Sequence, residues 1–367
     1  MNRDKKISVV LALSVVIFVV SAGYSLFKIG SNMISSSSNP KKEIVKNNHN
    51  KNKIEKDNLP DNTEENVTIN ISGVGDCTLG DDINNKGRGF SSVYKKVNDP
   101  KYFFKGVLKE LSNDDLTIAN LEGPLTTNGK RLEKQFAFRG LPEYTKILKE
   151  GSVEAVTLAN NHSMDYGDVG FMDTKKYLTS EGIGHFAYDE PAIIEKNGIK
   201  IGLLGFKAWS SGEYVRKNVE TSIKNIREKV DMVVVSFHWG DERAEKPNKD
   251  QLTLGRLAVD SGADLVLGHH PHVIQGIENY NGKNIVYSLS NFSFGGNSNP
   301  KDKDSFIYKQ GFTFDKNKKL VKIEEYKAIP VRISSVEYKN DYSPVILEGD
   351  EAVRVMDKLT YRSGLIN

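Results

Sequence analysis

From Val67 onward the sequence alternates short apolar runs of strand length with segments of helical periodicity, and this alternation limits the fold more than any other feature. Strand-like runs occupy residues 67–76, 114–123, 153–162, 230–240 and 263–272, and helical spacing occurs over 142–151, 168–182, 219–229 and 250–262. Asn-Gly pairs within 193–206 and 273–292 predict two β-hairpins, and 343–364 predicts a strand followed by a C-terminal helix. The pattern predicts an α/β domain with a mixed or two-sheet core.

The strand-like runs share a second feature, because five of them end in side chains suited to metal binding or acid–base chemistry. These side chains are Asp76, then Asn120 with Glu122, then Asn160, Asn161 and His162, then His238, and finally His269, His270 and His272. Five of the seven histidines lie at these ends. Loops that leave the carboxyl ends of strands in α/β folds converge, so we expect these residues to meet at one site.

Divalent-metal chemistry explains this mixture of side chains. Neutral imidazoles with carboxylate and amide oxygens suit zinc, manganese or iron, whereas sets of oxygen ligands suit magnesium or calcium. Pro271 restricts the backbone between His270 and His272, so we expect their imidazoles in a fixed geometry. Two metal ions about 4 Å apart could share a carboxylate, and Glu122 is the candidate bridge. Taken singly, each residue could instead cap a turn or a helix.

The N-terminal residues 1–30 predict a membrane anchor. Residues 7–27 are uncharged and mostly apolar, and Arg3, Lys5 and Lys6 precede them. A helix of that length spans roughly 30 Å, and the positive flank places the N-terminus in the cytoplasm and the remainder outside. A cleaved signal peptide is the alternative, but its apolar core is expected to be only ~7–15 residues long. Either interpretation exports the rest of the chain.

Composition limits the other classes of function. Residues 31–66 are rich in Ser, Asn and Lys and predict a disordered linker, followed by a domain over 67–335 with a C-terminal extension over 336–367. The net charge of +3, from 51 basic and 48 acidic residues, gives no electrostatic case for a nucleic-acid partner. The single cysteine, Cys77, excludes an internal disulfide and is predicted to be buried.

Six segments, taken in order, resemble the CapA family of poly-γ-glutamate capsule synthesis proteins. They are GVGDCTLG, ANLEGPLT, LANNHSMDYG, VSFHWGDE, GADLVLGHHPHV and IVYSLSNFSFG, and together they cover roughly residues 68–296. The resemblance implies a variant of the calcineurin-type metallophosphoesterase fold. That fold is a four-layer sandwich of two mixed β-sheets flanked by helices, here preceded by an N-terminal transmembrane helix.

The resemblance also implies roles for single residues. The implied metal ligands are Asp76, Glu122, Asn161, His238, His270 and His272. The implied catalytic residues are His162 and Asn161, and His162 takes the position that protonates a leaving group or binds the substrate anion. Residues expected to bind substrate or to support the ligands are Asn120, Asn160, His269 and Asn291. The guanidinium of Arg139 suits a carboxylate or phosphate, with a surface ion pair as the alternative.

The sequence departs from the metallophosphoesterase pattern at two points. Phosphoesterases of this fold usually carry Asp-x-His at the first strand end, but this chain has Thr78 in place of the histidine. A hydroxyl is the poorer ligand, so we expect a weak or empty first metal site, which argues against phosphoester hydrolysis. Ser290 stands where family members commonly have glycine, so we expect an altered backbone near Asn291.

Together these features predict a single-pass protein of the cell membrane with an extracytoplasmic domain. We expect it to act in poly-γ-glutamate synthesis or export alongside a capsule synthase membrane complex. Its cleft would bind the polymer, or another anionic polymer, through a divalent metal (Mn, Zn or Fe) or through cationic groups. The alternative is a secreted metal-dependent hydrolase that cleaves a phosphoester or a γ-glutamyl amide.

Overall fold

The computed structural model describes residues 66–85 and 87–366. The predicted anchor, residues 1–30, and all of the predicted linker except its last residue lie outside the described residues. Within the described ranges, no helix combines the length and the apolar character needed to cross a membrane.

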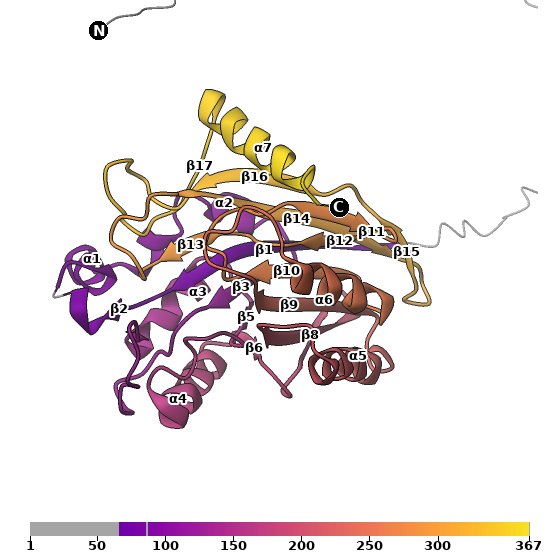
Figure 1. Ribbon diagram of the computed structural model, residues 1–367, viewed down its shortest axis with the longest axis horizontal. Helices are drawn as coiled ribbons and strands as arrows, with labels where there is room; N and C mark the ends of the chain where they lie inside the picture. The colour runs from indigo at the N-terminus through magenta and orange to yellow at the C-terminus, as the bar shows by residue number, and fades with distance from the viewer. Residues whose placement is uncertain (1–65, 86, 367) are drawn as a thin grey trace, which may run out of the picture. The chain divides into compact units, whose positions relative to one another are not determined.

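Two mixed β-sheets form the centre of the described fold (Figure 1). The nine-stranded sheet contains β1 (Val67–Thr78), β3 (Leu116–Leu121), β5 (Ala155–Thr157), β6 (Gly184–Phe186), β13 (Asn291–Phe294), β14 (Asp304–Phe314), β15 (Leu320–Ile323), β16 (Lys327–Arg332) and β17 (Val345–Ile346). The six-stranded sheet contains β7 (Ala192–Lys196), β8 (Ile199–Ala208), β9 (Met232–Trp239), β10 (Leu265–His269), β11 (Ile277–Tyr280) and β12 (Lys283–Val286). A small ribbon pairs β2 (Asp81–Asp82) with β4 (Phe138–Arg139).

The two sheets pack face to face through alternating apolar side chains. Ile71 and Ile118 of the nine-stranded sheet share one buried cluster with Leu203, Val234 and Leu267 of the six-stranded sheet. Within the regular stretches of these strands, every second side chain faces this layer, as pleating requires. The carboxyl ends of the central parallel strands therefore open at the edge of the same inter-sheet layer.

Helices cover the outer faces of both sheets. The nine-stranded sheet packs against α1 (Phe90–Val97), α2 (Leu108–Leu111), α3 (Thr145–Glu150) and α4 (Gly167–Ser180), and the six-stranded sheet against α5 (Glu213–Arg227) and α6 (Lys249–Asp260). Short 3₁₀ helices span Ile83–Asn85, Pro100–Phe103 and Pro142–Tyr144. The predicted α/β class with two mixed sheets is confirmed, and the outer helices complete a helix–sheet–sheet–helix arrangement.

The predicted C-terminal strand and helix are present as β17 and α7 (Gly349–Ser363). Val355 and Leu359 of α7 enter the inter-sheet cluster. Arg354 fixes the same helix to β14 through a bidentate ion pair, with its two terminal nitrogens 2.6 and 2.8 Å from the Asp304 carboxylate oxygens. Arg362 donates to the carbonyl of Ile274 at 2.7 Å. The C-terminal helix is thus packed into the same core as the sheets.

Several predicted elements have different lengths in the structure. Both Asn-Gly hairpins are confirmed, with the left-handed φ values at Asn197–Gly198 and Asn281–Gly282 that a type I′ turn requires. The run predicted as a strand over 153–162 forms only the short β5, and α5 begins at Glu213 rather than at 219. The last residues of the second predicted hairpin begin β13, which pairs with β1 in the nine-stranded sheet instead of staying with the hairpin in the six-stranded sheet.

The carboxyl group of Asp114 gives the fold a testable pH dependence. Burial raises the pKa of Asp114 from 3.8 to about 6. A raised folded-state pKa contributes stability that is fully present below pH 3.8 and is lost as the pH rises through 6. We expect Asp114→Asn to be about 1–2 kcal/mol more stable than wild type at pH 8, after discounting for partial exposure, and to show no gain at pH 4. Urea unfolding at both pH values measures this, and an equal difference at both would contradict it.

Candidate functional site

Strands from both sheets end at one place and bring the predicted polar residues together. In the nine-stranded sheet, Asp76 is in register with Asn120 on one side and with Asn291 on the other. In the six-stranded sheet, His269 is in register with His238. The predicted convergence of strand ends is therefore present, with ligands supplied by two sheets rather than one.

A β-bulge in β1 directs Asp76 toward the second sheet. Ile71 faces the layer between the sheets, whereas Val74 and Cys77 face the outer helices. Positions 71 and 77 would share a face in a regular strand, but the pairing register shifts between Gly73 and Asp76. The shift changes the phase of the strand. Asp76 therefore points between the sheets instead of into the helical layer.

The carboxylate of Asp76 is fully buried and surrounded by donors. Asn120 donates its Nδ2–H to Oδ1 at 2.8 Å, and the Nδ1 atoms of His269 and His272 lie 3.3 and 3.2 Å from the carboxylate. Burial alone would raise the pKa of Asp76, but the two histidines outweigh it and hold the pKa well below 3.8. Burial likewise opposes a charge on His272, yet Glu122 and Asp76 raise its pKa to about 9. Asp76 is therefore an ionised anchor for the histidine loop.

Glu122, His270 and His272 form a candidate metal site. One potential ligand atom from each lies within 4.8 Å of the other two. Oε1 of Glu122 and Nδ1 of His270 are buried and have no hydrogen-bond partner in the described residues. Burial raises the pKa of Glu122 and, with the charge of His272, lowers that of His270 to about 4. Buried acceptors without donors are costly, and a divalent cation that displaces the proton of His272 would satisfy both atoms, so the residues fit a metal.

Asn161 and His238 lie beside this candidate metal site, with the His238 ring centroid 4.7 Å from that of His270. Nε2 of His238 is 2.7 Å from Oδ1 of Asn161 and 3.7 Å from Oε1 of Glu122. Burial, and then the charge of His270, hold the pKa of His238 well below 6.5. His238 is therefore neutral and available as a nitrogen ligand.

His162 belongs to a separate hydrogen-bonded group at the border of this cluster. Its Nδ1 is 2.7 Å from Oδ2 of Asp165, and the same oxygen accepts the backbone N–H of Phe138 at 2.7 Å. Lys134 lies 2.6 Å from Oδ1 of Asp165 and donates to the carbonyl of Asn161 at 2.9 Å. Sequence reasoning missed Asp165 and Lys134. The acid three residues after His162 was a weak signal, and Lys134 comes from a loop with no recognisable pattern.

The remaining predicted residues divide into two groups. Asn160 supports the site through three hydrogen bonds. Its Nδ2 donates to Oδ1 of Asn120 and to the carbonyl of Leu121, and its Oδ1 accepts a hydrogen bond from the backbone N–H of His162. Asn291 accepts at 2.8 Å from Nδ1 of His272. Arg139 is different, because its guanidinium lies over the Tyr166 ring at 4.5 Å and no contact joins it to the cluster in the described structure.

The two residues that depart from the expected pattern, Thr78 and Ser290, and the neighbouring Cys77 all fit the local structure. Thr78 donates to Oε2 of Glu122 at 3.3 Å, so it positions the carboxylate. Cys77 is confirmed as buried, and burial raises the pKa of its thiol to about 12. Ser290 has φ 64°, the left-handed value that glycine favours, and its Oγ donates to the carbonyl of Asp304.

The loop that carries the histidines is strained. His270 has φ 96° and His272 has φ 57°, in a region that side-chain-bearing residues rarely adopt, and Pro271 lies between them. Such conformations persist only when the surrounding structure enforces them, and they are concentrated at functional sites. The backbone conformation of this loop therefore fixes the positions of the two imidazoles, as the sequence predicted.

The close approach of β1 to residue 290 can be tested by adding a methyl group. A Cβ at Gly75 would lie 2.2 Å from the backbone oxygen of Ser290. Because backbone must move, Gly75→Ala is expected to destabilise the fold by about 3 kcal/mol in urea unfolding. Gly212→Ala is the control, since its Cβ would meet nothing nearer than 3.7 Å. Equal stability of the two variants would contradict the described packing.

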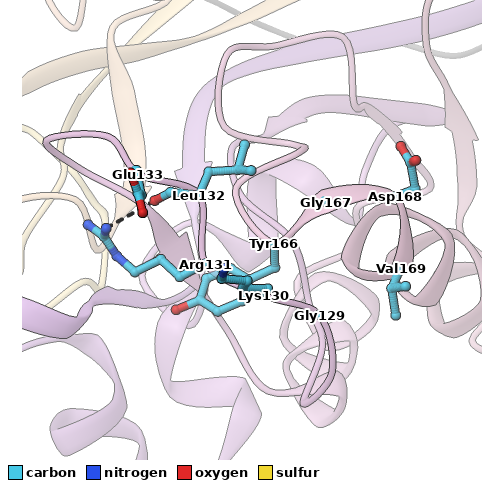
Figure 2. Close-up of a pocket in the computed structure, with 9 residues that line it drawn as sticks. All are labelled: Gly129, Lys130, Arg131, Leu132, Glu133, Tyr166, Gly167, Asp168 and Val169. Atoms are coloured by element: carbon cyan, nitrogen blue, oxygen red, sulfur yellow. Dashed lines mark hydrogen bonds between the residues drawn. The ribbon is translucent and has the colours of Figure 1, made fainter.

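A shallow pocket of about 420 Å³ lies next to the His162 group. Figure 2 shows the loop Gly129–Glu133 with Tyr166 beside it, and Asp168 and Val169 at the start of α4 on the other side. The backbone N–H of Leu132 donates to the carbonyl of Asp165 at 2.9 Å, which ties the pocket wall to that group. The pocket contains none of the candidate metal ligands.

Comparison with known proteins identifies the family. The model of the bacterial capsule synthesis protein family PGA_cap matches residues 70–296, more than half of the chain. The chain belongs to this family. The matched range contains every residue of the candidate cluster, from Asp76 to Asn291.

Two relatives within the family are similar over most of the domain. The PGA biosynthesis protein CapA of Bacillus subtilis is 34% identical over 273 residues, covering 67% of this chain and 72% of that protein. The capsule biosynthesis protein CapA of Bacillus anthracis is 32% identical over 257 residues, covering 63% of this chain and 61% of that protein.

Among solved structures, purple acid phosphatase PPD1 of yellow lupin overlays with a TM-score of 0.31 and 9% identity, covering 72% of this chain and 54% of that one. A likeness this loose adds nothing to the fold described above.

Proposed function

We propose that this chain takes part in the synthesis or export of a poly-γ-glutamate capsule, and that its cluster holds a divalent cation that binds carboxylates of the polymer. Family membership and the two CapA relatives support the first part. The observation that carries the second is the pair of buried, unpartnered atoms, Oε1 of Glu122 and Nδ1 of His270, beside His272.

The ligand chemistry limits the choice of cation. Two imidazoles with one carboxylate favour manganese, iron or zinc over calcium or magnesium. When bound, such an ion supplies a positive charge that can bind a carboxylate or polarise a carbonyl. The residues that would hold it are Glu122, His270 and His272, with His238 and Asn161 adjacent. Asp76 orients the histidine loop behind them.

A second candidate function is hydrolysis of the γ-glutamyl amide, and the His162 group favours it. Nδ1 of His162 is hydrogen-bonded to Asp165, so Nε2 is the ring atom that can exchange a proton with a substrate. Phosphoester hydrolysis has less support, because Thr78 stands where phosphoesterases of this fold usually have a histidine. The two functions predict different fates for the polymer.

We also propose that residues 1–30 anchor the chain in the cell membrane. The support for this location is the apolar run within these residues and the positive residues that precede it. In this account the anchor holds the domain on the outer surface of the membrane, near the complex that delivers the polymer.

Glu122→Gln in the full chain tests the proposed function. In a capsule-forming host we expect less than about a tenth of the wild-type polymer, because the carboxylate charge that holds the cation is lost. Glu195→Gln, at an exposed position in β7, is the control and should leave polymer output unchanged. Normal output from Glu122→Gln would mean that the cluster is not the working part.

The size of added polymer separates the two candidates. Purified wild-type protein with metal is incubated with poly-γ-glutamate, and chain length is followed by gel filtration. Binding without cleavage leaves the length unchanged, whereas a γ-glutamyl hydrolase shortens it.

A further inference from the structure

We propose that Lys207 and Trp209, at the end of β8, form a binding surface for one unit of an anionic polymer, with Lys207 receiving a carboxylate and Trp209 packing on the adjoining methylene groups. This inference rests on the proposed function and specifies where the polymer lies relative to the candidate metal site. Neither residue was among the predicted site residues.

Trp209 lies directly against the candidate metal ligands. Its ring centroid is 4.7 Å from that of His270 and 5.9 Å from that of His238, in both cases edge to face. The side chain is nevertheless 49% exposed, and its indole N–H has no acceptor in the described residues. The chain's other tryptophan, Trp239, is fully buried and donates to the carbonyl of Tyr287. An exposed indole at the border of a buried polar site is a typical ligand contact.

Lys207 presents a cation near Trp209. Lys207 is in register with His238 of β9, and the Trp209 ring lies 5.9 Å from the His238 ring, so both residues neighbour the same histidine. Its ammonium lies 5.9 Å from the centroid of the Tyr188 ring, and Tyr188 in turn donates to the carbonyl of Asn160.

Lys207 has no carboxylate partner in the described part of the chain, whereas each of four exposed lysines has one, namely Lys101, Lys149, Lys224 and Lys322. Burial and the charge of Lys134 both lower the pKa of Lys207. Lys134 itself is engaged by Asp165. An ammonium held near a second cation and without an anion is suited to bind an anionic ligand.

The pairing of one cation with one apolar surface matches the repeat of poly-γ-glutamate. Each unit of that polymer carries one free carboxylate and a short run of methylene groups in its main chain. A carboxylate on Lys207 and methylenes on Trp209 would direct the neighbouring unit toward His270. A simple inorganic anion would use Lys207 alone and would gain nothing from the indole.

Binding of poly-γ-glutamate to the metal-loaded protein tests the inference. The variants are Lys207→Gln, Trp209→Ala and Trp209→Phe, and the control is Lys200→Gln, which removes an exposed lysine from the opposite end of β8. Calorimetry should show about tenfold weaker binding for Lys207→Gln and Trp209→Ala, a smaller loss for Trp209→Phe, and no change for Lys200→Gln. The Mn²⁺ affinity of Lys207→Gln should equal that of wild type, which shows that the site is intact.

Tryptophan fluorescence provides an independent readout, because the chain has only two tryptophans and one is buried in the core. Added polymer should change the emission of wild type, and Trp209→Phe should abolish that change. The inference is overturned if wild type binds the polymer but Lys207→Gln and Trp209→Ala bind equally well, and the proposed function then survives. Equal weakening by Lys200→Gln would indicate non-specific attraction and would also overturn it. If wild type does not bind the polymer, both proposals fail.

Discussion

Replacing His270 with alanine is expected to lower the affinity of the protein for Mn²⁺ or Zn²⁺ by about a hundredfold or more. The imidazole is buried, and its Nδ1 has no hydrogen-bond partner in the described residues. Its pKa of about 4 means that the ring is neutral at pH 7 and needs no deprotonation before it binds a cation. Calorimetric titration of metal into the chelator-treated protein measures the loss.

His185→Ala is the matched control for this prediction. That histidine lies in β6, where its Nε2 is 3.0 Å from Oγ1 of Thr179, and it has no contact with Glu122 or His272 in the described structure. Metal affinity should be unchanged in the control. If His270→Ala binds metal as tightly as His185→Ala does, the candidate ligand set is wrong.

Replacing Asp165 with alanine is expected to destabilise the fold by about 3–5 kcal/mol. The side chain is fully buried and holds three partners at once, namely Lys134, His162 and the backbone N–H of Phe138. Removing it leaves the ammonium of Lys134 without its anion and frees the His162 ring to rotate. Urea unfolding at pH 7 measures the loss of stability.

Asp168→Ala separates this effect from a general loss of charge. Asp168 is three residues away, exposed, and in the first turn of α4, where a carboxylate contributes only about 0.3–1 kcal/mol through the helix dipole. Similar stabilities for the two variants would contradict the role assigned to Asp165. Asp165→Asn adds a finer test, because it keeps the shape of the side chain but removes the charge that faces Lys134.

The sequence predicted that the strand ends would converge, because strand ends carry a simple pattern. Runs of apolar residues ending in Asp76, Asn120, His238 or His269 indicated strands whose ends converge, and the structure places these four residues in direct contact with one another. The Asn-Gly hairpins were predictable for a similar reason, since a type I′ turn depends on only two residues.

Other features depended on tertiary packing and could not be predicted. The bulge that turns Asp76 toward the second sheet leaves no mark in the residue pattern. Lys134 reaches Asp165 from a loop whose path is fixed by contacts with distant segments. Lys207 and Trp209 lie beyond the hairpin predicted over 193–206. Only the register of β8 with β9 and the contact between the Trp209 and His238 rings place them beside His238. The strands β14, β15 and β16 were not predicted individually.

The most direct test of the central claim is anomalous X-ray diffraction from crystals of the domain grown with Mn²⁺ and measured at the manganese absorption edge. Our account predicts a strong anomalous peak bounded by the side chains of Glu122, His270 and His272. A protein that crystallises with saturating Mn²⁺ but shows no peak there, or shows its strongest peak elsewhere, would contradict the assignment of these strand ends as a metal site.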